Sequence, residues 1–208
     1  MDSDRSSSLP PPHWHSRGYL PHFDGGGLTQ FLTFRLAGSL PAAKLAQWEE
    51  ELKHLPENGR DVERRKRIEA WLDRPGADGW LRNERIARIV EDALLRFDAD
   101  RYRLHAWVVM PNHVHALITI APAQNLSAIL HSWKSFTATQ ANRVLGRRGK
   151  FWQEEYFDRF LRDAEHFAKA VDYIEMNPVK SGLCRAKGEW RFGSAWRLEK
   201  GEHAMPGA

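Results

Sequence analysis

The sequence predicts an α+β fold in which helices pack on an antiparallel sheet, and three observations support this. Residues 102–110 and 113–120 are both rich in β-branched and aromatic side chains, and only Pro111-Asn112 separates them, as in a hairpin. Residues 81–97 repeat apolar side chains every three or four positions, which predicts an amphipathic helix. Such runs follow one another in the order β-α-α-α-β-β-α-β-α, which resembles the ferredoxin-like plan.

The first part of the chain is expected to contain one strand and two helical pieces before the amphipathic helix. Residues 30–36 alternate aromatic and β-branched residues with others and predict the first strand. A helix is expected near 41–55, and a second one, carrying a basic cluster, over 60–72. Pro75-Gly76 should end this second helix.

The second part begins with the hairpin, which we expect in the middle of the sheet. Asn125 can cap a long helix that ends at Gly146. Residues 151–161 predict another strand, and a last helix should start near Asp163. Asn177-Pro178 should end that helix, because a residue before proline resists the helical conformation.

Composition limits the class of protein. The 208 residues with 42% hydrophobic content suit one globular domain. The net charge of +4 and pI near 9.3 permit a polyanionic partner without requiring one. Cys184 is the only cysteine, so neither an intramolecular disulfide nor a cysteine-rich metal cluster can form. Neither a signal peptide nor a membrane-spanning run is recognisable, so a soluble protein in the reducing cytoplasm is expected.

The chain is expected to divide into an arm, a domain and a tail. Residues 1–27 are rich in serine, proline and glycine and predict an irregular arm that can take part in DNA recognition. Residues 28–197 should form the domain, with a helical insertion near 56–80. Residues 198–208 are expected to be a flexible tail.

Two histidines and one helix carry the candidate chemistry. His113 and His115 flank a valine at the start of a strand, so both imidazoles project from one face of the sheet and form half of a metal site. Tyr173 and Asn177 are four residues apart, so the phenol and the amide share one face of the last helix. The amide oxygen can complete a His-His-Asn triad for Mg²⁺ or Mn²⁺, and the phenol can attack phosphorus.

Structural interpretations of the same residues remain open. Tyr173 also fits the edge of an amphipathic helix, and Asn177 also fits a helix C-cap. Tyr156 is a competing nucleophile, but on a strand it shares its face only with Asp158. Tyr173 is therefore the expected catalytic residue. The expected metal ligands are His113, His115 and Asn177.

Three motifs occur in a fixed order: WVVMPNHVH at 107–115, Trp152-Gln153, and YIEMNPVK at 173–180. Together they resemble the single-tyrosine HUH transposases of the IS200-like family, and most closely the REP-associated tyrosine transposase branch. In that family the histidine pair binds a divalent metal, and the tyrosine four residues before Asn or Gln is the nucleophile. The resemblance implies these roles for His113, His115, Asn177 and Tyr173.

The resemblance also implies a ferredoxin-like or RRM-like HUH nuclease fold. It implies activity on hairpin-bearing REP DNA with Mg²⁺ or Mn²⁺ as the cofactor. Residues 17–22 look like the N-terminal motif of the branch, and the resemblance extends from there to about residue 196. Residues 56–80 do not align with the family pattern.

The sequence thus predicts a single-strand DNA transposase that cleaves and rejoins DNA beside REP-type hairpins through a 5′-phosphotyrosine intermediate. Its partner is expected to be hairpin-bearing single-stranded DNA, and the protein is expected to act as a monomer or a homodimer near the nucleoid. One alternative is a domesticated hairpin-binding protein that no longer cuts. Others are an HUH nuclease of the replication-initiator or relaxase type and a metal-dependent hydrolase that uses water.

Two groups of residues are expected to contact DNA. Side chains of the arm can read unpaired bases beside a hairpin, because a single strand exposes base edges and faces. Basic side chains on and after the long helix can contact phosphates. These residues are Arg17, Tyr19, His22, Lys134, Arg143, Arg147, Arg148 and Lys150.

Overall fold

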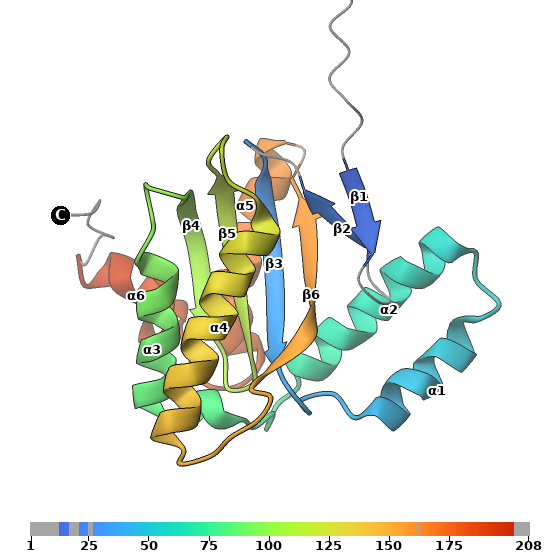
Figure 1. Ribbon diagram of the computed structural model, residues 1–208, viewed down its shortest axis with the longest axis horizontal. Helices are drawn as coiled ribbons and strands as arrows, with labels where there is room; N and C mark the ends of the chain where they lie inside the picture. Colours follow the sequence, from blue (N-terminus) through green and yellow to red (C-terminus); the bar gives the residue numbers. More distant parts are fainter. Residues whose placement is uncertain (1–12, 17–20, 25–26, 162, 202–208) are drawn as a thin grey trace, which may run out of the picture.

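A four-stranded antiparallel sheet forms the centre of the protein (Figure 1). The computed structural model describes residues 13–16, 21–24, 27–161 and 163–201. The strand order is β4-β5-β3-β6. The strands are β3 (Thr29–Leu36), β4 (Tyr102–Val109), β5 (His113–Ile120) and β6 (Trp152–Phe160). Helices cover both faces of this sheet, which confirms the predicted α+β fold.

Helices α3 (Glu84–Leu95) and α4 (Leu126–Val144) pack on one face of the sheet, the front face in Figure 1. Asn83 caps α3 by accepting from the backbone N–H of Arg85 at 3.0 Å, and Asn125 caps α4 in the same way through Ala128 at 2.8 Å. Side chains of both helices form one core cluster with alternate residues of the strands, including Val114. Trp133 belongs to this core.

Helix α5 (Ala164–Lys180) packs on the opposite face, behind the sheet in Figure 1. It begins at Asp163, which accepts from the backbone N–H of His166 at 2.8 Å. Ala170 and Ile174 are buried against Phe31 of β3 and Leu117 of β5. Helices α1 (Ala42–Leu52) and α2 (Glu57–Leu72) form a pair beside the β6 edge, with their own small apolar cluster. Helix α2 lies within residues 56–80, where a helical insertion is expected.

Short elements complete the chain. They are β1 (His13–Ser16), β2 (Pro21–Asp24), η1 (Trp80–Arg82), η2 (Lys187–Glu189) and α6 (Ser194–Glu199). The N-terminal arm was expected to be irregular, yet β1 and β2 pair with each other as an antiparallel ribbon. The two strands are held together by backbone pairing, because a segment rich in serine, proline and glycine does not form an apolar core. Within the described part of the chain, no helix has the length and apolarity needed to cross a membrane.

Two expectations about strand and helix placement were wrong. The hairpin does not lie wholly inside the sheet: β5 is internal, but β4 is an edge strand. The C-terminal segment shields that edge, because Val109 N–H donates to the carbonyl of Phe192 at 2.8 Å. Helix α5 does not end at Asn177 but runs through Pro178 to Lys180. A proline this near the end removes only one helical hydrogen bond, and Ser181 N–H still bonds the Asn177 carbonyl at 3.0 Å.

Candidate metal centre and nucleic-acid interface

The histidine pair lies on the α5 face of the internal strand β5. His113 and His115 are fully buried, while the intervening Val114 points into the core beneath α3 and α4. His113 Nδ1 lies 2.6 Å from Asn112 Oδ1, and His115 Nδ1 lies 2.8 Å from Thr33 Oγ1 on β3. With their Nδ1 atoms held in this way, the two rings lie edge-on to each other, and their Nε2 atoms are 2.9 Å apart.

Asp73, the residue that follows α2, reaches the same point from another direction. Its Oδ1 lies 3.1 Å from His113 Nε2 and 3.7 Å from His115 Nε2. Among the described residues, these three form a group whose potential ligand atoms all lie within 4.8 Å of one another. The backbone carbonyl of Asp73 accepts from Ser181 Oγ at 2.8 Å, which ties the end of α2 to the end of α5.

Helix α5 brings the phenol and the amide to this cluster. Tyr173 Oη donates to Asp73 Oδ2 at 2.7 Å, and Asn177 Nδ2 donates to the same oxygen at 2.8 Å. The Tyr173 ring also packs edge-on against His115, with centroids 5.4 Å apart. Asn177 is fully buried, and its Oδ1 has no hydrogen-bond partner among the residues that the structure describes. Residues from three parts of the chain therefore meet at one point.

Burial and charge set the protonation of the cluster. Burial, reinforced by the neighbouring His115, lowers the pKa of His113 to about 4, so its ring is neutral at pH 7. Burial alone would raise the pKa of Asp73, but its contacts with His113 and His115 outweigh this and hold the pKa well below its usual range. Burial and the nearby charges of Asp73 and Glu69 raise the pKa of Tyr173, so the resting phenol keeps its proton.

The His113, His115 and Asn177 set fits a divalent cation. Bonds of about 2.1 Å at right angles hold neighbouring ligand atoms about 3.0 Å apart, and the two Nε2 atoms lie 2.9 Å apart. Because Asn112 Oδ1 can only accept, the neutral His113 ring donates from Nδ1 and leaves the Nε2 lone pair directed at the cluster. The unsatisfied Asn177 Oδ1 is a hard donor of the type that Mg²⁺ and Mn²⁺ bind.

A groove leads along the α5 face to Tyr173. Its walls come from α2 and α5 and its floor from β3 and β6, and its volume is about 460 Å³. We call it the α2–α5 groove. The Arg65 guanidinium lies 4.5 Å from the Phe157 ring, and that of Arg159 lies 5.8 Å from the Phe31 ring. The other basic lining residues are Lys66, His166 and Lys169, and the acidic one is Glu69.

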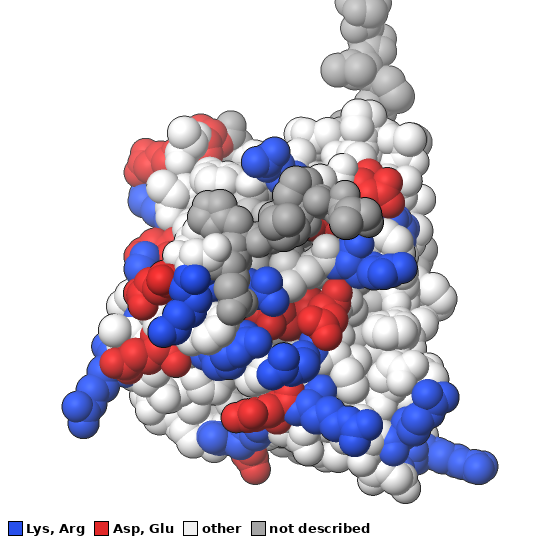
Figure 2. Space-filling model, turned by 90° about the vertical axis from the view of Figure 1, so that its left-hand side faces the viewer, with Lys and Arg blue, Asp and Glu red and all other residues white. Residues whose placement is uncertain are grey.

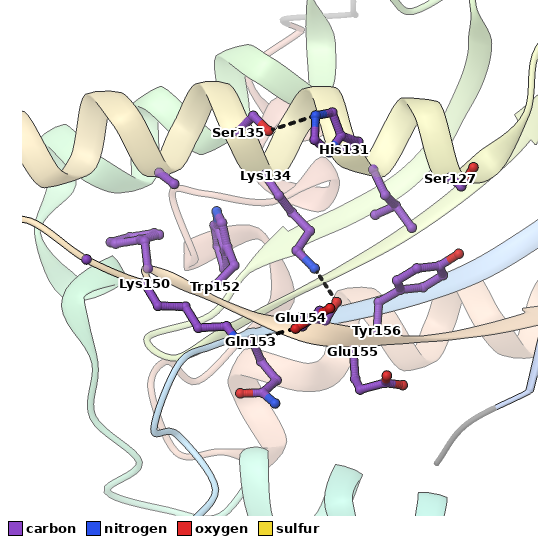
Figure 3. A pocket seen from close by; sticks show the side chains of 14 residues that line it. Ser127, His131, Lys134, Ser135, Lys150, Trp152, Gln153, Glu154, Glu155 and Tyr156 are labelled. Carbon is purple, nitrogen blue, oxygen red and sulfur yellow. Dashed lines mark hydrogen bonds and ion pairs between the residues drawn. The ribbon is translucent and has the colours of Figure 1, made fainter. Parts of the chain in front are cut away.

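Basic residues predicted to contact DNA lie on the other face of the sheet. Lys134 and Lys150 line a pocket of about 440 Å³ between α4 and β6 (Figure 3). Figure 3 shows the Lys134 side chain directed at β6, where its Nζ donates to the Glu154 carbonyl at 2.6 Å. Lys150 is 3.5 Å from the Glu154 carboxylate. Burial lowers the pKa of Lys134 to about 8. The structure does not bring these lysines together with Tyr173.

The structure places only some of the other residues that were predicted to contact DNA. Arg143 and Arg148 are exposed, and the Arg147 guanidinium packs 4.0 Å from the Trp80 ring. Arg17 and Tyr19 lie outside the described residues, and His22 is placed only through the backbone of β2. On the side where α3 and α6 lie, Figure 2 shows basic and acidic side chains interspersed.

Sequence reasoning missed three residues near Tyr173. Asp73 lies in the segment that did not align with the family pattern, and a carboxylate after a helix carries no local signal of burial. The sequence pattern places Arg65 in a basic cluster on a helix but does not indicate that it faces α5. Arg159 projects from β6 toward the α5 face, a direction that only the register with β3 reveals.

The chain is similar to known proteins over part of its length. A sequence profile described as "Transposase IS200 like" matches residues 78–177, which include both histidines, Tyr173 and Asn177. Over this segment, slightly less than half of its length, the chain is similar to the IS200-like transposases. The match begins after Asp73 and so excludes α2.

Individual relatives are distant. The chain is 26% identical to the REP-associated tyrosine transposase of Escherichia coli (strain K12) over 111 residues, 53% of this chain and 65% of that protein. A relative from Haemophilus influenzae is 27% identical over 104 residues, 45% of this chain and 59% of its own length. A solved REP-associated tyrosine transposase bound to a REP hairpin has the same fold, with a TM-score of 0.55 and 21% identity. That likeness covers 93% of this chain and 90% of the other.

Proposed function

We propose that this protein is a transposase that cleaves and rejoins single-stranded DNA beside a hairpin through a covalent 5′-phosphotyrosine link on Tyr173, with a divalent cation. The observation that carries the proposal is the meeting of Tyr173 and Asn177 with the buried histidine pair. A nucleophile-capable phenol and three metal-capable side chains at one point suit phosphoryl transfer. The hairpin substrate is proposed because a protein of the same fold is described as bound to a REP hairpin.

His113, His115 and Asn177 would hold Mg²⁺ or Mn²⁺. When bound, the cation would polarise the scissile phosphate and offset the charge that develops in the transition state. The protein's own contribution is position: β5 fixes both imidazoles, and α5 fixes the phenol and the amide one helical turn apart. The basic side chains of the α2–α5 groove would bind the phosphates of the strand that leads to Tyr173.

The proposed reaction exchanges one phosphate ester for another. The Tyr173 oxygen bonds to phosphorus while the bond from phosphorus to the 3′ oxygen breaks. The phenol proton passes to water as the new bond forms, while Asp73 Oδ2 orients the phenol through its hydrogen bond, and the 3′ oxygen takes up a proton to become a hydroxyl. The tyrosine ester keeps the energy of the original linkage, so a second 3′ hydroxyl can displace it and rejoin DNA without ATP.

The test is incubation of the protein and Mn²⁺ with labelled single strands that carry hairpin repeats from the flanking genome. A covalent protein–DNA species on a denaturing gel is expected, together with little cutting of a fully paired duplex, because a rigidly held nucleophile needs a strand that can bend into line. Equal cutting of duplex and single strand would contradict the proposal. Hairpin binding without any cleavage would instead favour a domesticated DNA-binding protein.

A further inference from the structure

Asp73 is a carboxylate at the metal centre that the family match does not include. We propose that Asp73 is an additional ligand of the divalent cation, supplied by α2, and that it positions Tyr173 through its other oxygen. This inference rests on the proposed metal site and extends it from a His-His-Asn set to a set with one acidic ligand.

The approach of Asp73 Oδ1 to the histidines is the first support. The oxygen lies 3.1 Å from His113 Nε2, close to the spacing of about 3.0 Å between neighbouring ligands of one ion. His113 Nδ1 bonds Asn112 Oδ1, and this contact leaves Nε2 directed at the Asp73 carboxylate.

The second support is the lack of hydrogen-bond partners for two buried oxygens of this cluster. Asp73 Oδ1 and Asn177 Oδ1 are both buried, and neither has a hydrogen-bond partner within the described parts of the chain. Buried oxygens are normally satisfied. Asp73 Oδ1 lies beside both imidazoles, and Asn177 bonds the same carboxylate through its Nδ2, so we infer that the two unsatisfied oxygens share a missing partner. A cation bound by both oxygens would satisfy them at once.

The remaining contacts of Asp73 hold it in place. Its Oδ2 accepts from Tyr173 and Asn177, and its carbonyl accepts from Ser181. A ligand fixed by such secondary contacts loses little freedom when a cation binds. The same carboxylate therefore links the metal centre to the nucleophile, and α2 contributes both this ligand and Arg65 of the α2–α5 groove.

The test measures Mn²⁺ binding to the full-length protein by titration calorimetry, without DNA. Asp73→Asn keeps the size of the side chain but removes its charge, and it should weaken Mn²⁺ binding by about ten-fold or more. Asp78→Asn is the matched control: this exposed carboxylate pairs with Arg82, and its loss should change the affinity by less than about two-fold. Unchanged affinity in Asp73→Asn, or no Mn²⁺ binding by the wild-type protein, would overturn the proposal.

A second measurement needs no variant and so does not depend on folding of Asp73→Asn. Anomalous scattering from wild-type crystals soaked in Mn²⁺ should place the ion about 2.2 Å from an Asp73 oxygen. An ion separated from Asp73 by a water molecule would contradict the proposal. If Mn²⁺ binding depends on Asp73 but no DNA adduct forms, the proposed function fails while this inference stands.

Discussion

Tyr173 Oη lies 2.7 Å from Asp73 Oδ2, although the two residues are 100 positions apart in the chain. The contact joins helix α5 to the end of α2 directly beside the histidine pair. It holds the phenol beside the candidate metal ligands and orients the phenol oxygen.

Loss of the phenol oxygen should be detectable in the stability of the protein. Tyr173→Phe removes a hydrogen bond to a charged, half-buried carboxylate, and such bonds contribute about 1.5–3 kcal/mol. Urea unfolding in EDTA should show a decrease of this size in the free energy of unfolding. Unchanged stability would mean that the contact is absent in solution.

Each imidazole should be required for cleavage. His113→Ala and His115→Ala each remove a ligand of a weakly held cation, so cleavage should be abolished while hairpin binding is largely kept. A gel assay for cleavage and a fluorescence assay for binding measure the two effects separately. His131→Ala, on exposed α4 surface across the sheet, is the control and should cut normally. Full activity of both histidine variants, or of the wild-type protein in excess EDTA, would show that cleavage requires no metal at this site.

The α2–α5 groove and the basic residues near α4 are alternative binding surfaces for DNA, and each alternative predicts a different variant with weakened binding. If the strand runs through the α2–α5 groove, the double variant Arg65→Ala/Arg159→Ala should weaken single-strand binding. The slope of log affinity against log salt should then become shallower by about 1.4, or about 0.7 for each lost phosphate contact. Arg148→Ala/Lys150→Ala removes the same charge from the α4 face and serves as the matched variant. The reverse result would support the DNA contacts predicted from the sequence.

Gly79 supports the turn before the histidines. A Cβ at this position would lie 2.3 Å from the Pro111 carbonyl and 3.0 Å from Asn112 Cα, so the turn leading to His113 would have to shift. Gly79→Ala should therefore lower the free energy of unfolding by about 1–3 kcal/mol, as overpacking does, and also weaken Mn²⁺ binding. Gly59→Ala, where the nearest atom is 3.5 Å away, is the control and should not destabilise. If Gly79→Ala is as stable as Gly59→Ala, the turn accommodates the added Cβ and the prediction is wrong.

Most of the fold could be predicted because its elements carry local signals. The first strand was expected over 30–36 and spans Thr29–Leu36, and the strand expected over 151–161 spans Trp152–Phe160. The predictions failed where the outcome depends on distant parts of the chain. The position of β4 at an edge is decided by the pairing of β5 with β3, and the continuation of α5 past Pro178 by burial of that turn.

The candidate site was predictable in part for the same reason. His113 with His115, and Tyr173 with Asn177, are pairs that lie within one strand or one helix, so their spacing alone places each pair on one face. Asp73 reaches them only because α2 ends beside β5, which no spacing along the chain reveals. The assignment of these residues to catalysis and metal binding remains a prediction.

The most direct test of the central claim is to identify the residue that carries DNA in a trapped covalent complex. The wild-type protein, Mn²⁺ and a hairpin-bearing single strand are incubated, the complex is digested, and mass spectrometry locates the attached nucleotide. The account predicts the nucleotide on Tyr173, no adduct with Tyr173→Phe, and a normal adduct with Tyr156→Phe, because Tyr156 packs in the core on the other face of the sheet. A nucleotide on Tyr156, or an adduct that persists in Tyr173→Phe, would contradict it.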